Sequence, residues 1–557
     1  MSISWTSSLW RDTTPKLSST ASDIILEDER YYTRRIQFVA PTPEYRFSDD
    51  GALQPGGPVS FTSRPFLGLL SQNIGIGILL GMFRCLSYPV FTVYLGLEGS
   101  QIATYDTIVS LAYGFKIFMA ILSDCAPFGR ARRKPYILLG WLLATASCLA
   151  MSCISFPSSR RAEDRKDTDN RLPPGSAPFL ILTLLAGIGY VLVIVTSDAI
   201  MVYYAQREAM DLRGKTQSVV YTARELSRIV PTIFCGVFLN SSDYGGNFDF
   251  SVTPNVPYML LTWVCVMTLI SAIFLLEEPQ ALGVFVLSDY MNGIWKLIQR
   301  NIMAQICLFR FFSEVSFNFH ATPTPNIAHL WIKVEPFYQS LFNLLGCCVY
   351  AITLSVCGRY GVSWSWRKSI IIATAFAVAI DAARSMLAVH NITRSQFLYL
   401  GLGDLENIPV ALRYITTMYS AVELADLGNE ALVYSIITTW ANLGVPVAAM
   451  LFKTIDSYYD VSVDKITKDN ATVRTQVMYT YILSYGIQLA GLSALIFLPD
   501  QKAEVQRLKQ NGRSRIATGV IMALALVIIG VFQFVVNMLP LLDSMSCLHL
   551  LGGPGCR

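Results

Sequence analysis

Charged residues are scarce in this sequence. Asp, Glu, Lys and Arg make up 15% of its 557 residues, whereas about 25% is typical of soluble domains. Hydrophobic residues account for 53%, and the mean hydropathy is +0.44. This composition excludes an ordinary soluble domain and predicts an all-α, polytopic membrane protein whose main partner is the lipid bilayer. The net charge of +4 is small and its cations lie mainly between apolar runs, so no nucleic-acid partner is expected.

Patterns that carry catalysis or bind metals are also missing. The twelve cysteines include no C-x-x-C pair, which argues against zinc ligation and against a redox dithiol. No Walker A sequence, paired-carboxylate pattern or nucleophile elbow is present. We therefore expect no enzyme activity, no metal and no cofactor. Cys547 and Cys556 stand apart, in the short tail after the last apolar run, where an oxidising outer face would allow a disulfide.

The first 64 residues lack the basic start and the apolar core of a signal peptide. They are polar and contain many Ser and Thr, which predicts a disordered cytoplasmic tail. The apolar runs that follow are long enough to cross the hydrocarbon, since about 20 residues suffice. Twelve runs are expected near 66–94, 102–122, 135–154, 178–203, 216–239, 257–276, 302–328, 337–357, 368–389, 397–421, 430–452 and 477–498, and a thirteenth near 516–541.

Basic residues gather in alternate connections between these runs. Lys and Arg in short loops resist translocation, so these connections and the N-terminus are placed in the cytoplasm, and the plasma membrane is the expected location. The three Asn-x-Ser/Thr sequons, at Asn240, Asn391 and Asn470, fall on the opposite side and are candidate glycosylation sites. The basic connections hold Arg130, Arg132, Arg133 and Lys134; Arg207, Arg213 and Lys215; Lys296 and Arg300; Arg359, Arg367 and Lys368; and Lys502, Arg507, Lys509, Arg513 and Arg515.

The connection between the second and third runs carries a motif. Asp124 ends the second run, and a turn with Gly129 and a basic cluster follow. This order resembles the loop between helices two and three of the major facilitator superfamily. The fuller string resembles the folate–biopterin transporter family, whose pattern reads roughly K-x(6)-S-D-x-x-P-x-x-G-x-R-R-x-P-Y. The matching residues are Lys116, Ser123, Asp124, Pro127, Arg132, Arg133, Pro135 and Tyr136, whereas Gly129 stands one position early and Ala112, Tyr113 and Ile117 depart from residues common in the family.

A second stretch supports the same resemblance. Glu430-Ala and Asn442-Leu-Gly resemble the family's Pro-x-Gly-x-Glu-Ala…Asn-Leu-Gly pattern, with Asp426 in place of the proline. The resemblance covers roughly residues 66–498. It implies two six-helix halves related as parallel repeats, a substrate site near the middle of the membrane, and alternating access by rocking of one half on the other.

The domain organisation follows from these observations. We expect a disordered tail over 1–64, an N-terminal six-helix half over 65–276 and a cytoplasmic linker over 277–300. A C-terminal six-helix half is expected over 301–499. Residues 500–557 are expected to add a basic cytoplasmic segment, an extra transmembrane helix and a short outer tail.

Several charges inside the predicted spans have a partner on the same helix face. Glu225 and Arg228, and Asp381 and Arg384, are three residues apart, and Arg310 and Glu314 are four apart. Because a charge at mid-bilayer costs about 2.5–3.5 kcal/mol on insertion scales, these spacings favour locally neutralised structural pairs. Arg224 is expected to join the Glu225 pair.

Three spans carry a charge without such a partner: Arg84, Lys116 and Asp198. These side chains are expected to face the bundle interior, where they pair with one another across helices or contact the substrate. Lys116 is the candidate residue for binding an anionic group of the substrate, and Arg84 is expected to assist it. Asp198 is the candidate for proton coupling, because burial raises a carboxyl pKa toward working pH. Arg413 in the tenth run is a further substrate-binding candidate.

Two predicted spans are interrupted at matching places in the two halves. Proline and glycine break the first run around Pro89, and Pro323 and Pro325 break the seventh. Freed backbone groups can line a cavity there, which points to a substrate site. The substrate-binding candidates near these breaks are Gln72, Asn73 and His320, the last of which has a structural hydrogen-bonding role as its alternative.

The motif loop also has the features of a gate. Asp124 is expected to contact Arg130, Arg132, Arg133 or an opposing helix end in one access state only. Together these features predict a secondary transporter for a folate, a pterin or a related small organic metabolite, with protons as coupling ion. Two alternatives stay open: a non-transporting receptor or scaffold with the same fold, and a carrier of a different metabolite such as S-adenosylmethionine.

Overall fold

The computed structural model describes residues 51–95, 105, 109, 111–126, 131–156, 177–244, 248–250, 252–278, 287–459, 461 and 463–538. Nearly all of these residues are helical, and two isolated bridges are the only β-pairing among them. The protein is an all-α, polytopic membrane protein, which confirms the predicted fold class.

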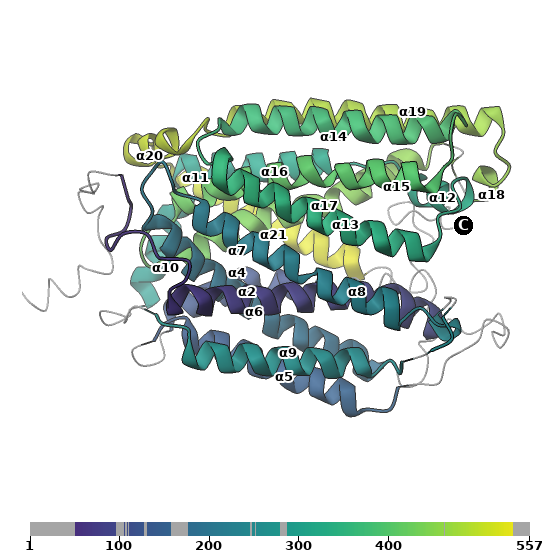
Figure 1. Cartoon of the computed structure of the whole chain (residues 1–557). Helices are drawn as coiled ribbons and strands as arrows, with labels where there is room; N and C mark the ends of the chain where they lie inside the picture. Colours follow the sequence, from purple (N-terminus) through teal and green to yellow (C-terminus); the bar gives the residue numbers. More distant parts are fainter. Residues whose placement is uncertain are drawn as a thin grey trace, which may run out of the picture.

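The helices before residue 280 lie together in the lower and middle part of Figure 1, and we call them the N-terminal helix group. Within this group α5 packs on α6 and α9, and α2 packs on both α7 and α9. The elements are α2 (Arg64–Leu86), η1 (Ser87–Tyr94), α4 (Lys116–Cys125), α5 (Lys134–Cys153), α6 (Ala177–Gln206), α7 (Lys215–Ser227), α8 (Ile229–Phe238), η3 (Ser242–Tyr244) and α9 (Val256–Phe274).

The helices between residues 301 and 497 lie in the upper and middle part of Figure 1 and form the C-terminal helix group. Here α11 packs on α17, and α14 packs on α16 and α19. The elements are α11 (Asn301–Phe317), α12 (Thr324–Leu330), α13 (Pro336–Val356), η4 (Cys357–Gly361), α14 (Trp366–Val389), α15 (Gln396–Leu405), α16 (Asn407–Leu424), α17 (Glu430–Asp456), α18 (Val463–Ile466), α19 (Ala471–Ala490) and η5 (Gly491–Phe497).

Three further helices lie outside these two groups: α10 (Leu287–Ile298), α20 (Lys502–Asn511) and α21 (Ile516–Met538). The groups themselves meet along a seam where α7 and α8 pack on α13, and α4 and α6 pack on α17. That the groups correspond to the predicted six-helix halves, 65–276 and 301–499, stays a prediction. The predicted outer disulfide between Cys547 and Cys556 lies outside the described residues.

Eight helices in the described part of the chain are long and apolar enough to cross a membrane. The predicted runs that do not qualify are split or short: the fifth is divided into α7 and α8, and the tenth into α15 and α16. The second run is described only in part, and the predicted total of twelve spans therefore stays a prediction. The eight helices are Arg64–Phe91, Lys134–Cys153, Ala177–Gln206, Val256–Phe274, Phe337–Gly361, Trp366–Val389, Glu430–Asp456 and Ala471–Phe497.

The predicted interruption of the seventh run is confirmed, because it stops at the end of α11, Phe317, and resumes at Thr324 directly after Pro323. The first run does not break at its glycines, since α2 extends through Gly75, Gly77 and Gly81 to Leu86. It continues without a gap as a π-helix, Ser87–Tyr94, that contains Pro89, a residue without a backbone donor. Both prolines thus lie where backbone groups leave the regular α-helical ladder.

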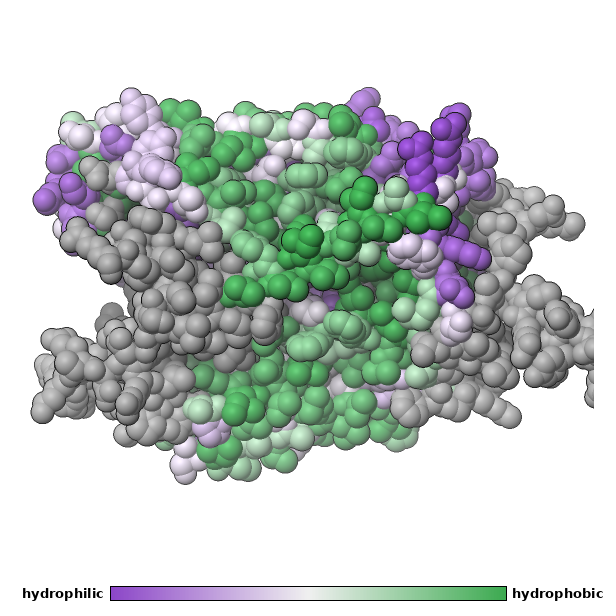
Figure 2. Space-filling view, turned by 180° about the vertical axis from the view of Figure 1, so that it is seen from behind, coloured by the Kyte–Doolittle hydropathy of each residue, from purple (hydrophilic) through white to green (hydrophobic). Residues whose placement is uncertain are grey.

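The outer surface of the bundle is apolar around its middle. Figure 2 shows a broad hydrophobic belt between two more polar ends. Bulky side chains on it are exposed, including Phe118, Trp263 and Phe274. The exposed face of α21 belongs to this surface, because Ile521, Ile528 and others on it are open while the helix packs on α10, α11 and α17. Such a surface is stable only against lipid.

One close helix contact decides where the buried charges lie. A Cβ atom at Gly77 of α2 would stand 2.0 Å from Ser227 Oγ and 2.1 Å from the carbonyl oxygen of Arg224. Only glycine therefore lets α2 approach α7 this closely. The contact brings Asn73, one turn earlier on α2, beside the Arg224 side chain.

Candidate functional site

A buried ion pair joins α6 and α7, two helices of the N-terminal helix group that also pack on the C-terminal helix group. Arg224 of α7 donates to Asp198 of α6, with 2.6 Å between Nη2 and Oδ1. Asn73 Oδ1 of α2 accepts a second bond from Arg224 Nε at 2.9 Å. All three side chains are buried. A buried carboxylate needs such a partner, and Arg224 supplies a fixed, permanently charged one.

Lys116 brings a second cation to the seam between the groups. Its side chain is 4% exposed, and Nζ donates to Thr438 Oγ1 of α17 at 2.8 Å. The ammonium group also lies 6.0 Å from the ring centroid of Tyr434. Asp198 and Arg224 are near enough for their charges to act on it. Among the described residues Lys116 makes no ion pair, so its neighbours across the seam are neutral.

Tyrosine rings surround these charges and come from both groups. The hydroxyl groups of Tyr221 and Tyr434 are in contact, and the Tyr221 and Tyr414 rings meet edge to face with centroids 5.2 Å apart. The Arg224 guanidinium lies over the Tyr221 ring, 5.0 Å from its centroid. Flat apolar faces beside one carboxylate and two cations can hold a flat heterocycle together with an anionic group.

Arg224 is the residue that sequence reasoning placed wrongly. It was expected to join Glu225, but its ion pair is with Asp198, because α7 turns Arg224 inward. Glu225 pairs with Arg228 alone, at 2.6 Å. The other predicted local pairs are confirmed: Arg310 lies 3.2 Å from Glu314, and Arg384 is paired with Asp381 on the same helix face.

The remaining substrate-binding candidates are spread over the bundle. Gln72 faces the interior of the N-terminal helix group, where it accepts a bond from Trp141 Nε1 and donates to the carbonyl of Thr268. Arg84 is exposed, and among the described residues it makes no ion pair. His320 follows α11 and is exposed, and Arg413 is buried among α11, α14 and α16. Only Asn73, Lys116 and Asp198 share one cluster with Arg224.

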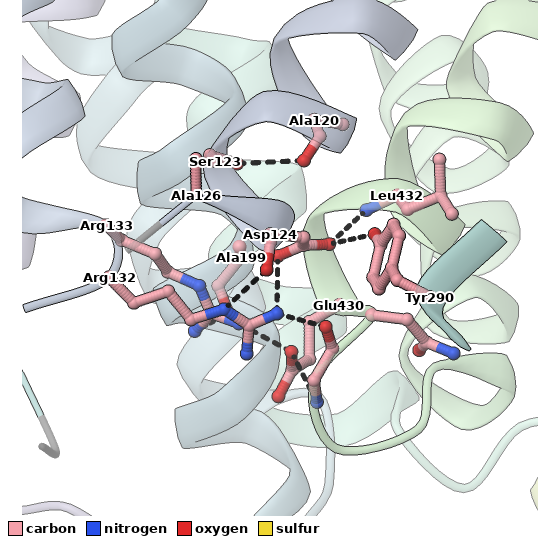
Figure 3. A network of polar contacts seen from close by, with 12 residues as sticks. Ala120, Ser123, Asp124, Ala126, Arg132, Arg133, Ala199, Tyr290, Glu430 and Leu432 are labelled. Carbon is pink, nitrogen blue, oxygen red and sulfur yellow. Dashed lines mark hydrogen bonds and ion pairs between the residues drawn. The ribbon is translucent and has the colours of Figure 1, made fainter. Parts of the chain in front are cut away.

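The predicted gate residue Asp124 lies one residue before the end of α4. Figure 3 shows it beside Arg132, with Leu432 and Tyr290 on its other side. Its Oδ2 atom accepts a bond from the backbone N–H of Leu432 in α17 at 3.0 Å, and one from Tyr290 of α10 at 3.3 Å. Arg132 Nη2 lies 3.2 Å from Oδ1. One carboxylate thus joins α4, α10 and the first turn of α17.

Arg133 makes a second link across the seam. Its Nη2 atom is 2.5 Å from Glu430 Oε2 in α17, and both side chains are buried. The Glu278 carboxylate after α9 accepts the backbone N–H groups of Arg133 and Lys134, which caps the start of α5. The geometry therefore fixes the basic loop against both groups. The predicted gate residue Arg130 lies outside the described residues.

Further ion pairs at the end of the bundle that carries the basic loop were not predicted. Arg213 binds Glu423 of α16 at 2.7 and 2.8 Å, and Arg300 and Lys509 both bind Asp426, at 3.0 and 2.7 Å. The C-terminal helix α20 takes part, because Gln506 also donates to Glu423. These contacts join segments far apart in sequence. We call the end that holds them the basic end of the bundle.

The three sequons lie at the other end, which we call the sequon end. Asn240 follows α8, Asn391 follows α14 with a left-handed φ of 56°, and Asn470 precedes α19, where its side chain accepts the N–H of Val473. Asn391 and Asn470 are exposed. Their modification stays a prediction, and in Figure 1 α12 and α18 mark this end while α10 and α20 mark the basic end.

A helical bundle with an apolar belt, ion pairs gathered at one end and buried charges near the seam between two helix groups has the features of a membrane transporter. The chain belongs to the BT1 family, whose model matches residues 76–514. It is similar to a folate-biopterin transporter from Synechocystis sp. (strain ATCC 27184 / PCC 6803 / Kazusa), with 21% identity over 421 residues, or 73% of this chain and 77% of the relative. The predicted family is thereby confirmed.

Proposed function

We propose that the protein is a secondary transporter that carries a folate, a pterin or a related small organic metabolite by alternating access, with protons as the coupling ion. The observation that supports this most is the seam cluster of Asp198, Arg224, Lys116 and the tyrosines around them. A charged side chain inside the bilayer costs several kcal/mol. Proteins keep such residues where they line a pathway for substrate or ions. The name of the cyanobacterial relative agrees with the substrate class.

In this proposal Lys116 binds an anionic group of the substrate. Its ammonium is a compact donor that a neutral hydroxyl, Thr438, holds at the seam, so an incoming carboxylate gains a full charge interaction without displacing an acid. The rings of Tyr221, Tyr414 and Tyr434 provide the flat contacts that a pterin requires. Arg84, Gln72, His320 and Arg413 lie apart from this cluster and are secondary candidates.

Asp198 is the proposed proton-coupling group. In the described conformation its carboxylate is bound by Arg224. Uptake of a proton must therefore accompany separation of this pair, and Asn73 remains as an alternative partner for Arg224. Coupling follows if the substrate binds tightly only in the protonated state.

Alternating access is supported by the uneven distribution of the cross-seam ion pairs. Arg133 and Arg213 both make theirs at the basic end, where Asp124 also accepts a hydrogen bond across the seam from the backbone N–H of Leu432. We propose that these contacts close the basic end and that they separate when the two groups rock. The basic end and the N-terminus are both proposed to face the cytoplasm. The plasma membrane and glycosylation at the sequon end belong to the same proposal.

The test is uptake by transport-deficient cells that express the protein. Labelled folate, pterin and S-adenosylmethionine are offered at external pH 5.5 and 7.5 at matched surface expression. We expect accumulation of a folate or pterin that increases at the lower pH. Uptake of S-adenosylmethionine alone would assign the cationic substrate, with Asp198 as its counter-ion. No uptake of any compound into cells or vesicles would favour the receptor or scaffold alternative.

A further inference from the structure

A buried arginine in the C-terminal helix group has no acidic partner. Arg413 of α16 is 7% exposed, and its Nη1 donates to Thr374 Oγ1 of α14 at 2.7 Å. Nη2 donates to Ser313 Oγ of α11 at 2.8 Å and to its carbonyl oxygen at 3.3 Å. The Phe317 ring lies 4.0 Å from the guanidinium carbon. Every one of these partners is neutral.

The charges nearby do not neutralise Arg413. The two charged groups that act on it are Glu314 and Arg310 of α11. They pair with each other at 3.2 Å, so their charges cancel. Among the described residues Arg413 has no ion pair. One uncompensated positive charge thus stays in a dry helical core, where an isolated cation is strongly disfavoured.

A pocket adjoins the guanidinium group. Its lining includes Arg413, Ser313, Phe317, Ser316, Gln488 and Gly491. Ser313 accepts its bond from Arg413, so its own hydroxyl hydrogen can point to a ligand. The cavity volume is about 10 Å³, close to the minimum that holds one water-sized particle and far below the roughly 300 Å³ at which cavities for drug-sized ligands begin. A complete folate or pterin conjugate does not fit.

We propose that this pocket binds a small inorganic anion, chloride being the physiological one, as the counter-ion of Arg413. The guanidinium supplies the charge and Ser313 supplies a hydroxyl donor. The Phe317 face and the surrounding helices exclude water, which strengthens the interaction with the charge. The site is separate from the Lys116 cluster and does not depend on the proposed transport activity.

The role of such an anion is structural. Bound chloride neutralises the core of the C-terminal helix group and holds α11, α14 and α16 together through one residue. A ligand that binds the folded state alone raises its stability in proportion to the logarithm of its concentration. The stability of the purified protein should therefore depend on chloride at constant ionic strength.

The experiment measures the thermal unfolding midpoint of the full chain in detergent while sodium gluconate replaces sodium chloride, without any substrate. We expect the midpoint to rise by about 3 °C between 1 and 150 mM chloride, with saturation, as for a specific ligand. Bromide should act like chloride. Arg413→Gln should abolish the response, whereas Arg384→Gln, which alters an arginine paired with Asp381 and Glu406, should keep it.

Two results would overturn the site. One is a wild-type midpoint that does not change with chloride, and the other is an undiminished response in Arg413→Gln. If that variant does not fold, Ser313→Ala provides the second arm, because it removes the hydroxyl donor but keeps the charge, and it should shift half-saturation to higher chloride by about tenfold.

Discussion

Lys116 of the N-terminal helix group donates a 2.8 Å hydrogen bond to Thr438 of the C-terminal helix group. The ammonium group of one helix group is thus hydrogen-bonded to a hydroxyl of the other helix group, and the Tyr434 ring lies beside it. A structural lysine in this place would be expected to bind a carboxylate, as Arg224 does with Asp198. The neutral partner leaves the charge of Lys116 available to an anionic ligand.

Asp124→Asn should slow transport with little change in substrate affinity. The substitution keeps the shape of the side chain but removes the charge that holds Arg132 and that strengthens the bond from Leu432. Both contacts belong to the basic end, about two helical turns along α4 from Lys116. We expect the maximal uptake rate to fall about tenfold while KM changes less than twofold. Asp211→Asn, an exposed acid at the same end, is the control. Equal maximal rates at matched surface expression would dismiss Asp124 as a gate residue.

Asp198→Asn should separate coupling from exchange. The amide cannot titrate, and Arg224 keeps Asn73 as a partner, so the site remains assembled. We expect pH-driven accumulation in proteoliposomes to be lost while substrate exchange between the two sides continues. Asp381→Asn removes an acid paired with Arg384 in the other group and serves as control. Accumulation that still follows the pH gradient in the Asp198 variant would exclude this residue as the proton carrier.

Helix α21 should cross the membrane and place the C-terminus outside. Its apolar stretch Ile516–Phe532 is shorter than the eight candidate spans, but the helix continues to Met538. It begins near the basic end, where Thr518 contacts Asn301. An epitope at the C-terminus should therefore stain on intact cells, and an epitope at the N-terminus should stain only after permeabilisation. If the C-terminal epitope also required permeabilisation, α21 would lie on the inner surface, which is the alternative.

Asp469 should make the sequon end sensitive to acid. Hydrogen bonds from Arg394 and Arg474 hold the pKa of Asp469 well below its usual range. Its contribution to stability is therefore present above the unfolded pKa of about 3.9 and is lost as the pH falls toward the lowered value. Asn tolerates the left-handed φ of 44° at this position, so Asp469→Asn isolates the charge.

We expect Asp469→Asn to lower the free energy of unfolding by about 0.5–1 kcal/mol at pH 7, and the difference from wild type to shrink below about pH 4. Thermal midpoints in detergent across this pH range provide the measurement. The exposed acid Asp464 has no ion pair among the described residues, so Asp464→Asn should leave the midpoint unchanged. A deficit that persisted undiminished at pH 3 would show that the ion pairs with Arg394 and Arg474 are not its cause.

Much of the fold was predictable because single helices determine it. The apolar runs, the departures from the α-helix at Pro89 and Pro323, and the pairs at helical spacing, such as Glu225 with Arg228, depend on residues close in sequence. The motif around Asp124 pointed to a contact with an opposing helix end, and the structure contains one, to Leu432.

The partners of the buried charges were not predictable in the same way. Arg224 and Asp198 are 26 positions apart, on α7 and α6. The bond from Arg224 to Asn73 goes with the close approach of α2 to α7 at Gly77, which no local pattern specifies. The position of Thr438 beside Lys116 depends on the contact between the two groups. One signal in the sequence could have indicated Arg224. Residues 224, 225 and 228 are two arginines and one glutamate, so one of the two cations has no acidic partner on this helix.

The most direct test of the substrate site is initial uptake of labelled folate or pterin by proteoliposomes containing wild type, Lys116→Met or Lys453→Met. Lys453 is an exposed lysine of α17 and controls for the substitution itself. We predict that Lys116→Met raises KM for the anionic substrate by about tenfold to a hundredfold, the range for loss of a charged hydrogen bond, with normal folding, whereas Lys453→Met behaves as wild type. Wild-type uptake by a well-folded Lys116→Met protein would contradict the assignment of the site.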